Sequence, residues 1–385
     1  MSSNSFIPLS VPNLSGNEWK YAEDAIKTGW VSSVGSYVDE FEQKFAEFVG
    51  VKRAIAVVNG TAALHISLML AGVEEGDEVI VPDLTFVAPA NAVAYCNATP
   101  VFLGSEWSTL GLDPIILQKF LEEKCELKDG QTFNKNTGRR IAAIIPMHTF
   151  GNPVDMDPIL KLCQTSNIPV IEDATESLGS LYKGAKTGSF GLLGCFSFNG
   201  NKIMTTGGGG MIVTNDEKLA DRAKHLSTTA KSDPIEYDHD EIGYNYRLVN
   251  VLAAIGVGQL EQMGDFVETK RRNYDCYIKN LSNVQGMQMF VEQEHSESNY
   301  WMYPLILETI TPMDLTRALG EKRIQARPVW KLMHTLPMFK HCESFGIEDS
   351  EEIYNKVLCI PCSTDLSEED VNRVCKSLEE VANNE

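Results

Sequence analysis

The stretch Ile168-Pro-Val-Ile-Glu-Asp173-Ala-Thr-Glu176-Ser joins a short apolar, β-branched run to two carboxylates. A run of this length and composition is typical of a buried strand, so the carboxylates should lie at its carboxyl end. A second stretch, Ser197-Phe-Asn-Gly-Asn-Lys202, places one lysine in a Gly/Asn loop after another apolar run. Open α/β sheets bind ligands outside the carboxyl ends of their strands. In both stretches polar residues follow a predicted strand, so these residues are candidates for one ligand site.

The acid and the lysine are the two groups that pyridoxal phosphate (PLP) chemistry requires. A lysine amine forms a Schiff base with the cofactor aldehyde. A carboxylate keeps the pyridine nitrogen protonated, so that the ring can withdraw electrons. Each residue also has an ordinary alternative: Asp173 could cap a helix, Glu176 could be an exposed acid at a helix start, and Lys202 could be solvated. The combination favours the PLP interpretation.

Apolar β-branched runs alternate with helix-like stretches on both sides of these motifs. Strands are predicted at 54–58, 78–81, 99–102, 141–146, 168–171, 194–198 and 210–214, and helices at 62–71, 89–96 and 156–165. This alternation predicts an α/β fold with a mostly parallel sheet that is covered on both faces. The loop that holds Lys202 leads to another strand rather than to a helix.

The pattern changes after Arg247. A long helix is predicted at 249–263, continuing toward residue 278, followed by strands at 302–307 and 324–328 and helices at 312–320 and 367–381. We therefore expect a large PLP-binding domain at 1–250 and a smaller C-terminal α+β domain at 251–385. Residues 125–140 are polar and rich in Gly and Asn, which predicts a surface insertion.

The composition excludes several classes of function. The 385 residues carry a formal net charge of −20, which disfavours binding to nucleic acid or to anionic membranes. No apolar run is long enough to span a membrane, and the N-terminus lacks the pattern of a signal peptide. Nine scattered cysteines indicate reduced thiols and a cytoplasmic protein. Cys359-Ile-Pro-Cys362 is interpreted as a buried strand that enters a loop, and Asp238-His-Asp-Glu241 as a solvated acidic turn, so no metal site is expected.

Further residues could hold the phosphate or the ring of PLP. Gly60 and Thr61 open a predicted helix, where free N–H groups attract phosphate, although an ordinary helix cap has the same pattern. Phe86 follows a strand and could stack on a cofactor ring or belong to the core. Ser197 could donate a hydrogen bond to phosphate. Asn245 could bind an anion or belong to a helix-capping turn.

Together the motifs resemble the DegT/DnrJ/EryC1/StrS sugar aminotransferases, which are PLP enzymes of fold type I, the aspartate aminotransferase-like fold. The resemblance extends from Ile7 to the final helix. It rests on Gly29-Trp-Val-Ser-Ser33, Asn59-Gly-Thr-Ala-Ala-Leu64, Thr85-Phe86, Glu172-Asp-Ala174, Ser197-Phe-Asn-Gly-Asn-Lys202 and Gly243-Tyr-Asn-Tyr-Arg247. The chain departs from many members at Asn199-Gly-Asn201, where they have His-Pro-Thr, and at Glu176 and Leu178, where they have Gln and His. These departures look like the branch that serves legionaminic acid and N-acetylbacillosamine synthesis.

The resemblance implies a role for each motif. Lys202 would hold the cofactor and move the proton, and Asp173 would pair with the pyridine nitrogen. Asn245 would reach the phosphate of the neighbouring subunit, which makes a homodimer the working unit. The candidate cofactor contacts are Gly60, Thr61, Phe86, Asp173, Glu176, Ser197, Lys202 and Asn245, with Glu176 placed to reach the ring hydroxyl of the cofactor. The candidate substrate contacts are Trp30, Ser32, Asn199, Tyr246, Arg247, Arg327 and His334, although His334 could equally be a loop histidine with its hydrogen bonds satisfied.

The implied reaction moves an amino group from L-glutamate to C4 of a nucleotide-linked 4-keto-6-deoxy-N-acetylhexosamine, with pyridoxamine phosphate as the intermediate cofactor form. The branch indicates a UDP-linked sugar, with a GDP-linked sugar left open. The alternative is a non-catalytic PLP or sugar-nucleotide binding protein on the same fold. A PLP sugar dehydratase is disfavoured because those members replace the lysine by histidine. A nicotinamide oxidoreductase is disfavoured because no Gly-x-Gly-x-x-Gly joins a strand to a helix.

Overall fold

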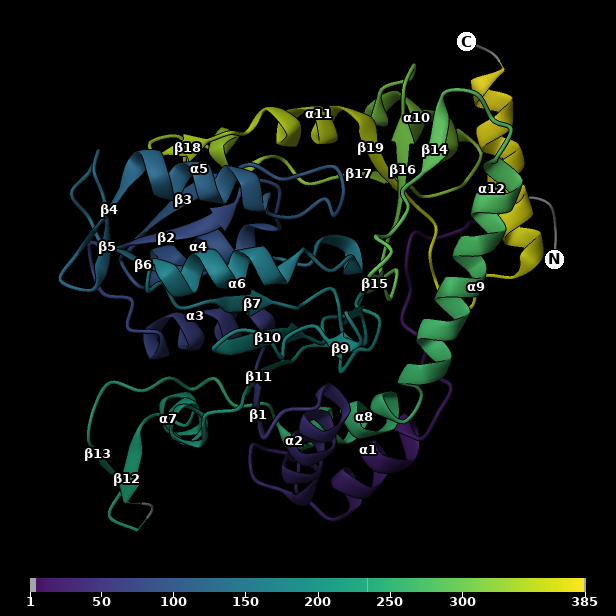
Figure 1. Cartoon of the computed structure of the whole chain (residues 1–385). Helices are drawn as coiled ribbons and strands as arrows, with labels where there is room; N and C mark the ends of the chain where they lie inside the picture. Colours follow the sequence, from purple (N-terminus) through teal and green to yellow (C-terminus); the bar gives the residue numbers. More distant parts are fainter. Residues whose placement is uncertain (1–4, 234, 384–385) are drawn as a thin grey trace.

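The computed structural model describes residues 5–233 and 235–383. Figure 1 shows a central sheet with helices on both sides, a group of mostly N-terminal helices beside it, and a smaller sheet toward the C-terminal end of the chain. The long helix α9 (Met263–Leu281) runs along one edge of the molecule and connects the N-terminal helices to the smaller sheet (Figure 1).

The central sheet consists of two four-stranded units, with strand orders β1-β11-β10-β7 and β18-β3-β2-β6. Parallel bridges join the units, from Ile144 to Val170 and from Met147 to Asp173. All pairings within the two units are parallel except those of β11 with β1 and β10. The strands are β1 (Arg53–Val57), β2 (Glu78–Pro82), β3 (Thr99–Leu103), β6 (Ile141–Ile144), β7 (Ile171–Asp173), β10 (Leu193–Ser197), β11 (Gly210–Thr214) and β18 (Ser344–Phe345).

Helices bury both faces of this sheet. In β2, Val79 and Val81 belong to one core and Ile80 to the other, because successive side chains of a strand point to opposite faces. The first core includes residues of α3 (Gly60–Leu70), α4 (Val87–Tyr95) and α7 (Glu217–Ser227), and the second includes residues of α5 (Pro114–Lys124) and α6 (Met156–Thr165). The predicted α/β architecture with a mostly parallel sheet is therefore confirmed. Each element predicted between residues 54 and 214 overlaps an observed one, whereas α5 was not predicted.

One predicted strand is displaced. A strand was expected at 168–171, whereas β7 begins at Ile171 and ends at Asp173. Pro169 has no N–H group to donate to a neighbouring strand. Its carbonyl accepts a hydrogen bond from Ile144, and Val170 forms only an isolated bridge. The ladder therefore becomes regular after the proline, and Asp173 is the last residue of the strand.

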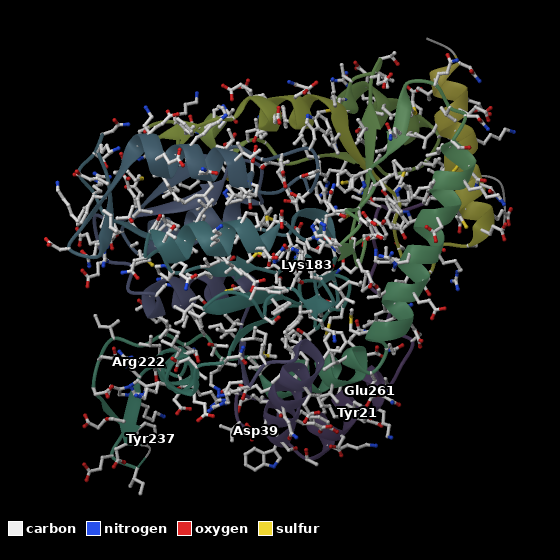
Figure 2. The ribbon with its side chains drawn as sticks, viewed as in Figure 1. Tyr21, Asp39, Lys183, Arg222, Tyr237 and Glu261 are labelled. Carbon is white, nitrogen blue, oxygen red and sulfur yellow. The ribbon has the colours of Figure 1, made fainter. Side chains whose placement is uncertain are left out.

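The prediction of one long helix after Arg247 is wrong. The segment forms two helices, α8 (Asn250–Leu260) and α9, which are separated by Glu261 and Gln262. The Gln262 side chain donates hydrogen bonds to Glu18 Oε1 (2.6 Å) and to the Gly258 carbonyl (3.1 Å). Tyr21 donates to Glu261 at 2.8 Å, and Figure 2 shows these two side chains close together. Contacts with α1 (Glu18–Lys27) thus accompany the break, which the local sequence does not signal.

The smaller sheet has the order β14-β16-β19-β17 and is antiparallel throughout. Its strands are β14 (Met287–Met289), β16 (Tyr303–Leu307), β19 (Val357–Ile360) and β17 (Arg327–Pro328). Helices α10 (Pro312–Glu321) and α9 pack against these strands, and α12 (Glu368–Ala382) packs against α9 and α10. Helix α8 packs instead against α1 and α2 (Ser36–Val49). The predicted domain division at residue 250 remains a prediction.

The remaining elements are short or peripheral. The segment predicted as a surface insertion forms a hairpin of β4 (Cys125–Lys128) and β5 (Gln131–Asn134), and buried Asn134 anchors it by donating to Glu78 at 2.9 Å. A second hairpin, β12 (Lys231–Asp233) and β13 (Asp238–His239), projects from the body and carries Tyr237 (Figure 2). The others are β8 (Leu181–Tyr182), β9 (Ala185–Lys186), β15 (Ser296–Glu297), α11 (Glu348–Lys356) and the 3₁₀ turns Thr149–Gly151 and Met333–Thr335. Among the described residues, no helix is long and apolar enough to cross a membrane.

Candidate active site

A pocket with a cavity volume of about 230 Å³ lies between the carboxyl ends of central strands and the smaller sheet. Its lining includes Gly60 and Thr61 at the start of α3, Ser197 at the end of β10, Lys202, and Arg327 of β17. The two quoted stretches of sequence therefore meet at one cavity, as the strand-end argument predicted.

The start of α3 forms a cradle on one side of this pocket. Asn59 is extended and caps the helix by accepting a hydrogen bond from the N–H of Ala62 at 2.8 Å. The first N–H groups of a helix have no partner within the helix and carry partial positive charge. A Cβ atom on Gly60 would lie 2.9 Å from Cβ of Ser197, so the glycine allows the helix to start against the end of β10. This donor set fits a phosphate group.

Asp173 ends β7 and is 1% exposed; it is not part of the pocket lining, but Thr175, two residues later, is. Its side chain accepts a hydrogen bond from the N–H of Thr175 at 3.1 Å. Burial raises the pKa of Asp173, because the ionised carboxylate loses its hydration. A positively charged partner such as a pyridinium would offset this cost, so the carboxyl suits the role that the resemblance implies.

A buried pair next to Asp173 was missed by the sequence reasoning. His148 and Glu172 are both fully buried, with His148 Nε2 at 3.1 Å from Glu172 Oε2. Glu172 also accepts the N–H groups of Gly188, Phe190 and Gly191. The Val154 N–H donates to His148 Nδ1, so the ring proton lies on Nε2 and points toward Glu172. The available signal was His148, which closely follows the predicted strand at 141–146.

Lys202 extends into the pocket with 13% of its side chain exposed. Its Nζ atom lies 3.2 Å from Glu176 Oε1 and 3.9 Å from the centre of the Trp301 ring. Glu176 Oε2 accepts the N–H of Phe150 at 2.9 Å. Burial raises the pKa of Glu176 to about 7, although the Lys202 charge opposes that change. Lys202 is therefore held by contacts within the protein rather than solvated, and Glu176 is buried. The ordinary alternatives for these two residues, a solvated lysine and an exposed acid at a helix start, are wrong.

Aromatic residues enclose the pocket. Phe86 lines it and is 49% exposed, so the alternative that Phe86 is a core aromatic is wrong. Its ring meets that of Trp330 edge to face, and Trp330 in turn packs on Phe150 with ring centres 4.7 Å apart. The sequence reasoning missed Phe150, Trp301 and Trp330. Their local sequences carry no motif, and only the tertiary fold brings them to the cavity.

The predicted substrate contacts lie in three different places. Asn199 and Arg327 line the pocket. Trp30 and Ser32 are exposed, and buried Asn250 holds the main chain of both. The remaining residues also lie outside the pocket lining. Tyr246, Arg247 and the cofactor candidate Asn245 form a segment beside β1, and the main-chain N–H of His334 donates to Asp83 Oδ1 at 3.0 Å, with His334 Nδ1 at 2.7 Å from Asp83 Oδ2.

A group of possible metal ligands lies elsewhere, near the β12–β13 hairpin. The ligand atoms of His225, Asp240 and Glu241 are within 4.8 Å of one another. Arg222, which Figure 2 labels beside this hairpin, makes two hydrogen bonds to Glu241. His239, by contrast, contacts the Thr229 carbonyl. Ion pairing among these side chains accounts for the cluster.

Comparison with known proteins agrees with this geometry. The family model of the DegT/DnrJ/EryC1/StrS aminotransferase family matches residues 12–379. The putative pyridoxal phosphate-dependent aminotransferase EpsN of Bacillus subtilis (strain 168) is 41% identical over 97% of this chain and 95% of that protein. GDP-perosamine synthase of Escherichia coli O157:H7 is 39% identical over 97% of this chain and 98% of that protein. Among solved structures, the aminotransferase TlmJ from Streptoalloteichus hindustanus superimposes with a TM-score of 0.89 at 27% identity, covering 98% of this chain and 100% of TlmJ.

Proposed function

Because the chain belongs to the DegT/DnrJ/EryC1/StrS family of PLP-dependent aminotransferases, we propose that it transfers an amino group from L-glutamate to C4 of a nucleotide-linked 4-keto-6-deoxyhexose. The observation that carries the proposal is the convergence of Lys202 and the start of α3 at one pocket, with buried Asp173 two residues before Thr175 of the pocket lining. A lysine, an acid and a phosphate cradle are the groups that a PLP enzyme needs, and they come from three separate segments.

PLP, when bound, supplies an electron sink that stabilises negative charge on the carbon that loses its proton. The protein's own residues would hold it in three ways. The N–H groups of Gly60 and Thr61 and the Ser197 hydroxyl would bind the phosphate, and Phe86 would cover the ring. Asp173 would hold the pyridine nitrogen protonated, since a carboxylate buried without a cationic partner is costly.

Lys202 is the group that we assign to proton transfer. Its amine would take the α-proton of glutamate and return a proton within the first half-reaction, which releases 2-oxoglutarate. In the second half-reaction the same amine would deliver a proton to C4 of the sugar. One amine can act as both acid and base because its surroundings adjust the balance between the two forms. The enclosing aromatic side chains of Phe150, Trp301 and Trp330 would exclude water during both steps.

The identity of the sugar nucleotide has two candidates. The sequence departures at Asn199-Gly-Asn201 and Glu176 support a UDP-linked N-acetylhexosamine, as in legionaminic acid and N-acetylbacillosamine synthesis. The similarity to a GDP-perosamine synthase supports a GDP-linked sugar instead. Incubation with glutamate labelled with ¹⁵N in its amino group, and with each 4-keto-6-deoxy sugar in turn, separates the two. Transfer of ¹⁵N to the UDP-linked N-acetyl sugar alone supports the first candidate, transfer to the GDP-linked sugar alone supports the second, and transfer to neither contradicts the proposed function.

We further propose a homodimer in which Asn245 completes the site of the partner. Asn245 is exposed and lies outside the pocket lining of its own chain, which supports a role in a neighbouring subunit. Mixing two inactive variants, Lys202→Ala and Asn245→Asp, tests this arrangement. If Asn245 acts across the interface, one site of each mixed dimer regains both native residues and activity returns. If Asn245 acts within its own chain, the mixture stays inactive.

The proposed location is the cytoplasm, supported by nine cysteines that are all free thiols. The alternative function, a non-catalytic PLP or sugar-nucleotide binding protein, predicts binding of the sugar nucleotide without ¹⁵N transfer. If the protein only binds, Lys202→Ala leaves the affinity for the sugar nucleotide unchanged, and neither wild type nor variant shows turnover. If the protein is a transaminase, the same change abolishes turnover.

A further inference from the structure

Two groups contact the Lys202 amine from different parts of the fold. Glu176, on the segment after β7, lies 3.2 Å from Nζ, and the ring of Trp301, just before β16, lies with its centre 3.9 Å away. Glu176 is 2% exposed and Trp301 4% exposed. A carboxylate and an aromatic face both stabilise an ammonium ion more than they stabilise a neutral amine.

Both groups are held rigidly, and one buried residue holds them together. The Asn299 side chain donates to the carbonyls of Glu176 and Leu178, each at 2.9 Å, and accepts the N–H of Trp301 at 2.8 Å. Asn299 is fully buried. The main chains on either side of the lysine are therefore linked through a single amide.

The two side chains are also fixed individually. The second oxygen of Glu176 is occupied by the N–H of Phe150. The indole N–H of Trp301 donates to the Asn201 carbonyl at 2.7 Å, so Trp301 is bound to the loop that carries Lys202. Buried Lys270 donates to the Trp301 carbonyl at 3.0 Å. Neither group needs to reorganise in order to receive the lysine.

We propose that Glu176 and Trp301 form a resting site that holds the amine of Lys202 as an ammonium ion in the cofactor-free protein. The consequence for catalysis rests on the proposed function: after the amine has taken a proton, both groups stabilise the charge and keep the lysine facing the reacting carbon. They are positioning residues, because they act through Lys202. The proposal also gives a physical role to a carboxylate where many family members have a neutral glutamine.

Trace labelling of lysine amines with deuterated acetic anhydride tests the resting site without any turnover. The cofactor-free, full-length protein is labelled at a constant pH well above 7, where the Glu176 carboxyl is ionised, and is then unfolded, fully acetylated and analysed by peptide mass spectrometry, with exposed Lys218 as the internal reference. Only the neutral amine reacts. Because an opposite charge at this distance favours the charged form by roughly tenfold or more, Glu176→Gln should accelerate the labelling of Lys202 about tenfold relative to Lys218. An unchanged ratio overturns the proposal.

The tryptophan needs a control for access to the pocket. Trp301→Leu should accelerate Lys202 labelling roughly threefold, in line with a cation–π contact. Trp330→Leu opens the same pocket without removing the contact with Nζ and should leave the ratio unchanged. Equal acceleration by both variants would show that access alone controls labelling, which overturns the role of Trp301.

A reciprocal measurement covers the case in which Glu176→Gln does not fold. The charged or titratable groups that act on Glu176 or respond to it are Lys202, Asp173 and Cys359. Because the lysine charge lowers the pKa of Glu176, Lys202→Met should raise that pKa above its wild-type value, as followed by the infrared carbonyl band of ¹³C-labelled glutamate. No change in the pKa contradicts the resting site. Neither measurement depends on aminotransferase activity, so failure of the proposed function is detected separately by ¹⁵N transfer.

Discussion

Gly60 and Ser197 approach so closely that a Cβ atom on Gly60 would lie 2.9 Å from Cβ of Ser197 and 3.4 Å from its hydroxyl oxygen. The first residue of α3 and the last residue of β10 therefore share one small volume. The glycine conformation itself is ordinary, so the requirement for glycine at this position is one of space. The contact brings the helix N–H groups and the serine hydroxyl to the same point of the pocket.

This contact predicts the effect of Gly60→Ala. The added methyl group must displace either Cβ of Ser197 or the backbone at the start of α3. Neither can move aside as easily as the end of a long, flexible side chain. We expect PLP affinity to fall on the order of tenfold, as for the loss of a charge-assisted hydrogen bond, while the protein still folds. Titration of absorbance with PLP measures the affinity. Gly320→Ala, where nothing lies within 4 Å of the added atom, is the matched control and should bind PLP normally. Equal affinity of Gly60→Ala and wild type would contradict the phosphate cradle.

Asp173→Asn tests the acid at the end of β7. Asparagine fills the same space but cannot hold a pyridinium as an ion pair, so the cofactor would lose much of its capacity to withdraw electrons. We expect kcat to fall by roughly a hundredfold or more, as when a preorganised charge is removed from an active site, with PLP still bound. Steady-state kinetics with glutamate provide the measurement. A variant with near-native kcat would remove Asp173 from the assigned role.

Asn299→Ala is expected to reduce stability strongly. The substitution leaves the carbonyls of Glu176 and Leu178 and the N–H of Trp301 without their buried partner, and each such loss costs about 1–3 kcal/mol. Urea denaturation of the full-length protein should show a large decrease in the unfolding midpoint. Asn280→Ala removes an exposed hydrogen bond to Asn372 and should shift the midpoint little. Similar midpoints for the two variants would mean that the Asn299 bridge contributes little.

The pH dependence of stability should report on Glu176. Burial raises the pKa of this carboxyl from its ordinary value of 4.5 to about 7 in the folded protein. The folded state therefore keeps a proton that the unfolded chain releases, and the resulting stabilisation is complete below pH 4.5 and is lost as the pH rises through 7. A difference of this size corresponds to about 3 kcal/mol.

Glu176→Gln isolates this contribution from those of other buried carboxyls. Urea denaturation of the cofactor-free proteins is measured between pH 4.5 and 8. The free energy of unfolding of wild type should decrease relative to that of the variant across this range. Parallel curves for the two proteins would show that Glu176 titrates normally.

The local sequence was sufficient for the central sheet, apart from the unpredicted strand β18, and for the residues at its strand ends. Periodicity located the strands that end at Asp173 and Ser197, and parallel strands bring their carboxyl ends to one edge. The same reasoning failed at Gln262, where contacts with Glu18 accompany the end of α8. A break caused by residues so distant in sequence leaves no mark in hydrophobic periodicity.

The site was predicted only in part, because local sequence patterns locate residues at strand ends but not contacts made by tertiary packing. Gly60, Lys202 and Phe86 follow strand ends, so motif and topology place them together. Trp301 and Asn299 precede a strand of the smaller sheet, and only the tertiary fold brings Trp301 to Lys202 and Asn299 to Glu176. Such contacts depend on tertiary packing, which a single sequence does not encode in any local pattern. The strand at 168–171 was displaced because Pro169 lacks an N–H group.

The most direct test of the central claim, that Lys202 lies at the centre of an aminotransferase site, is a two-step absorbance experiment. Glutamate is added to the yellow PLP-loaded protein, then removed, and a UDP-linked or GDP-linked 4-keto-6-deoxy sugar is added. The account predicts bleaching by glutamate and return of the yellow colour with one of the two sugars in wild type, and neither change in Lys202→Ala. A wild-type protein that shows no bleaching with glutamate, or a Lys202→Ala variant that completes the cycle, would contradict it.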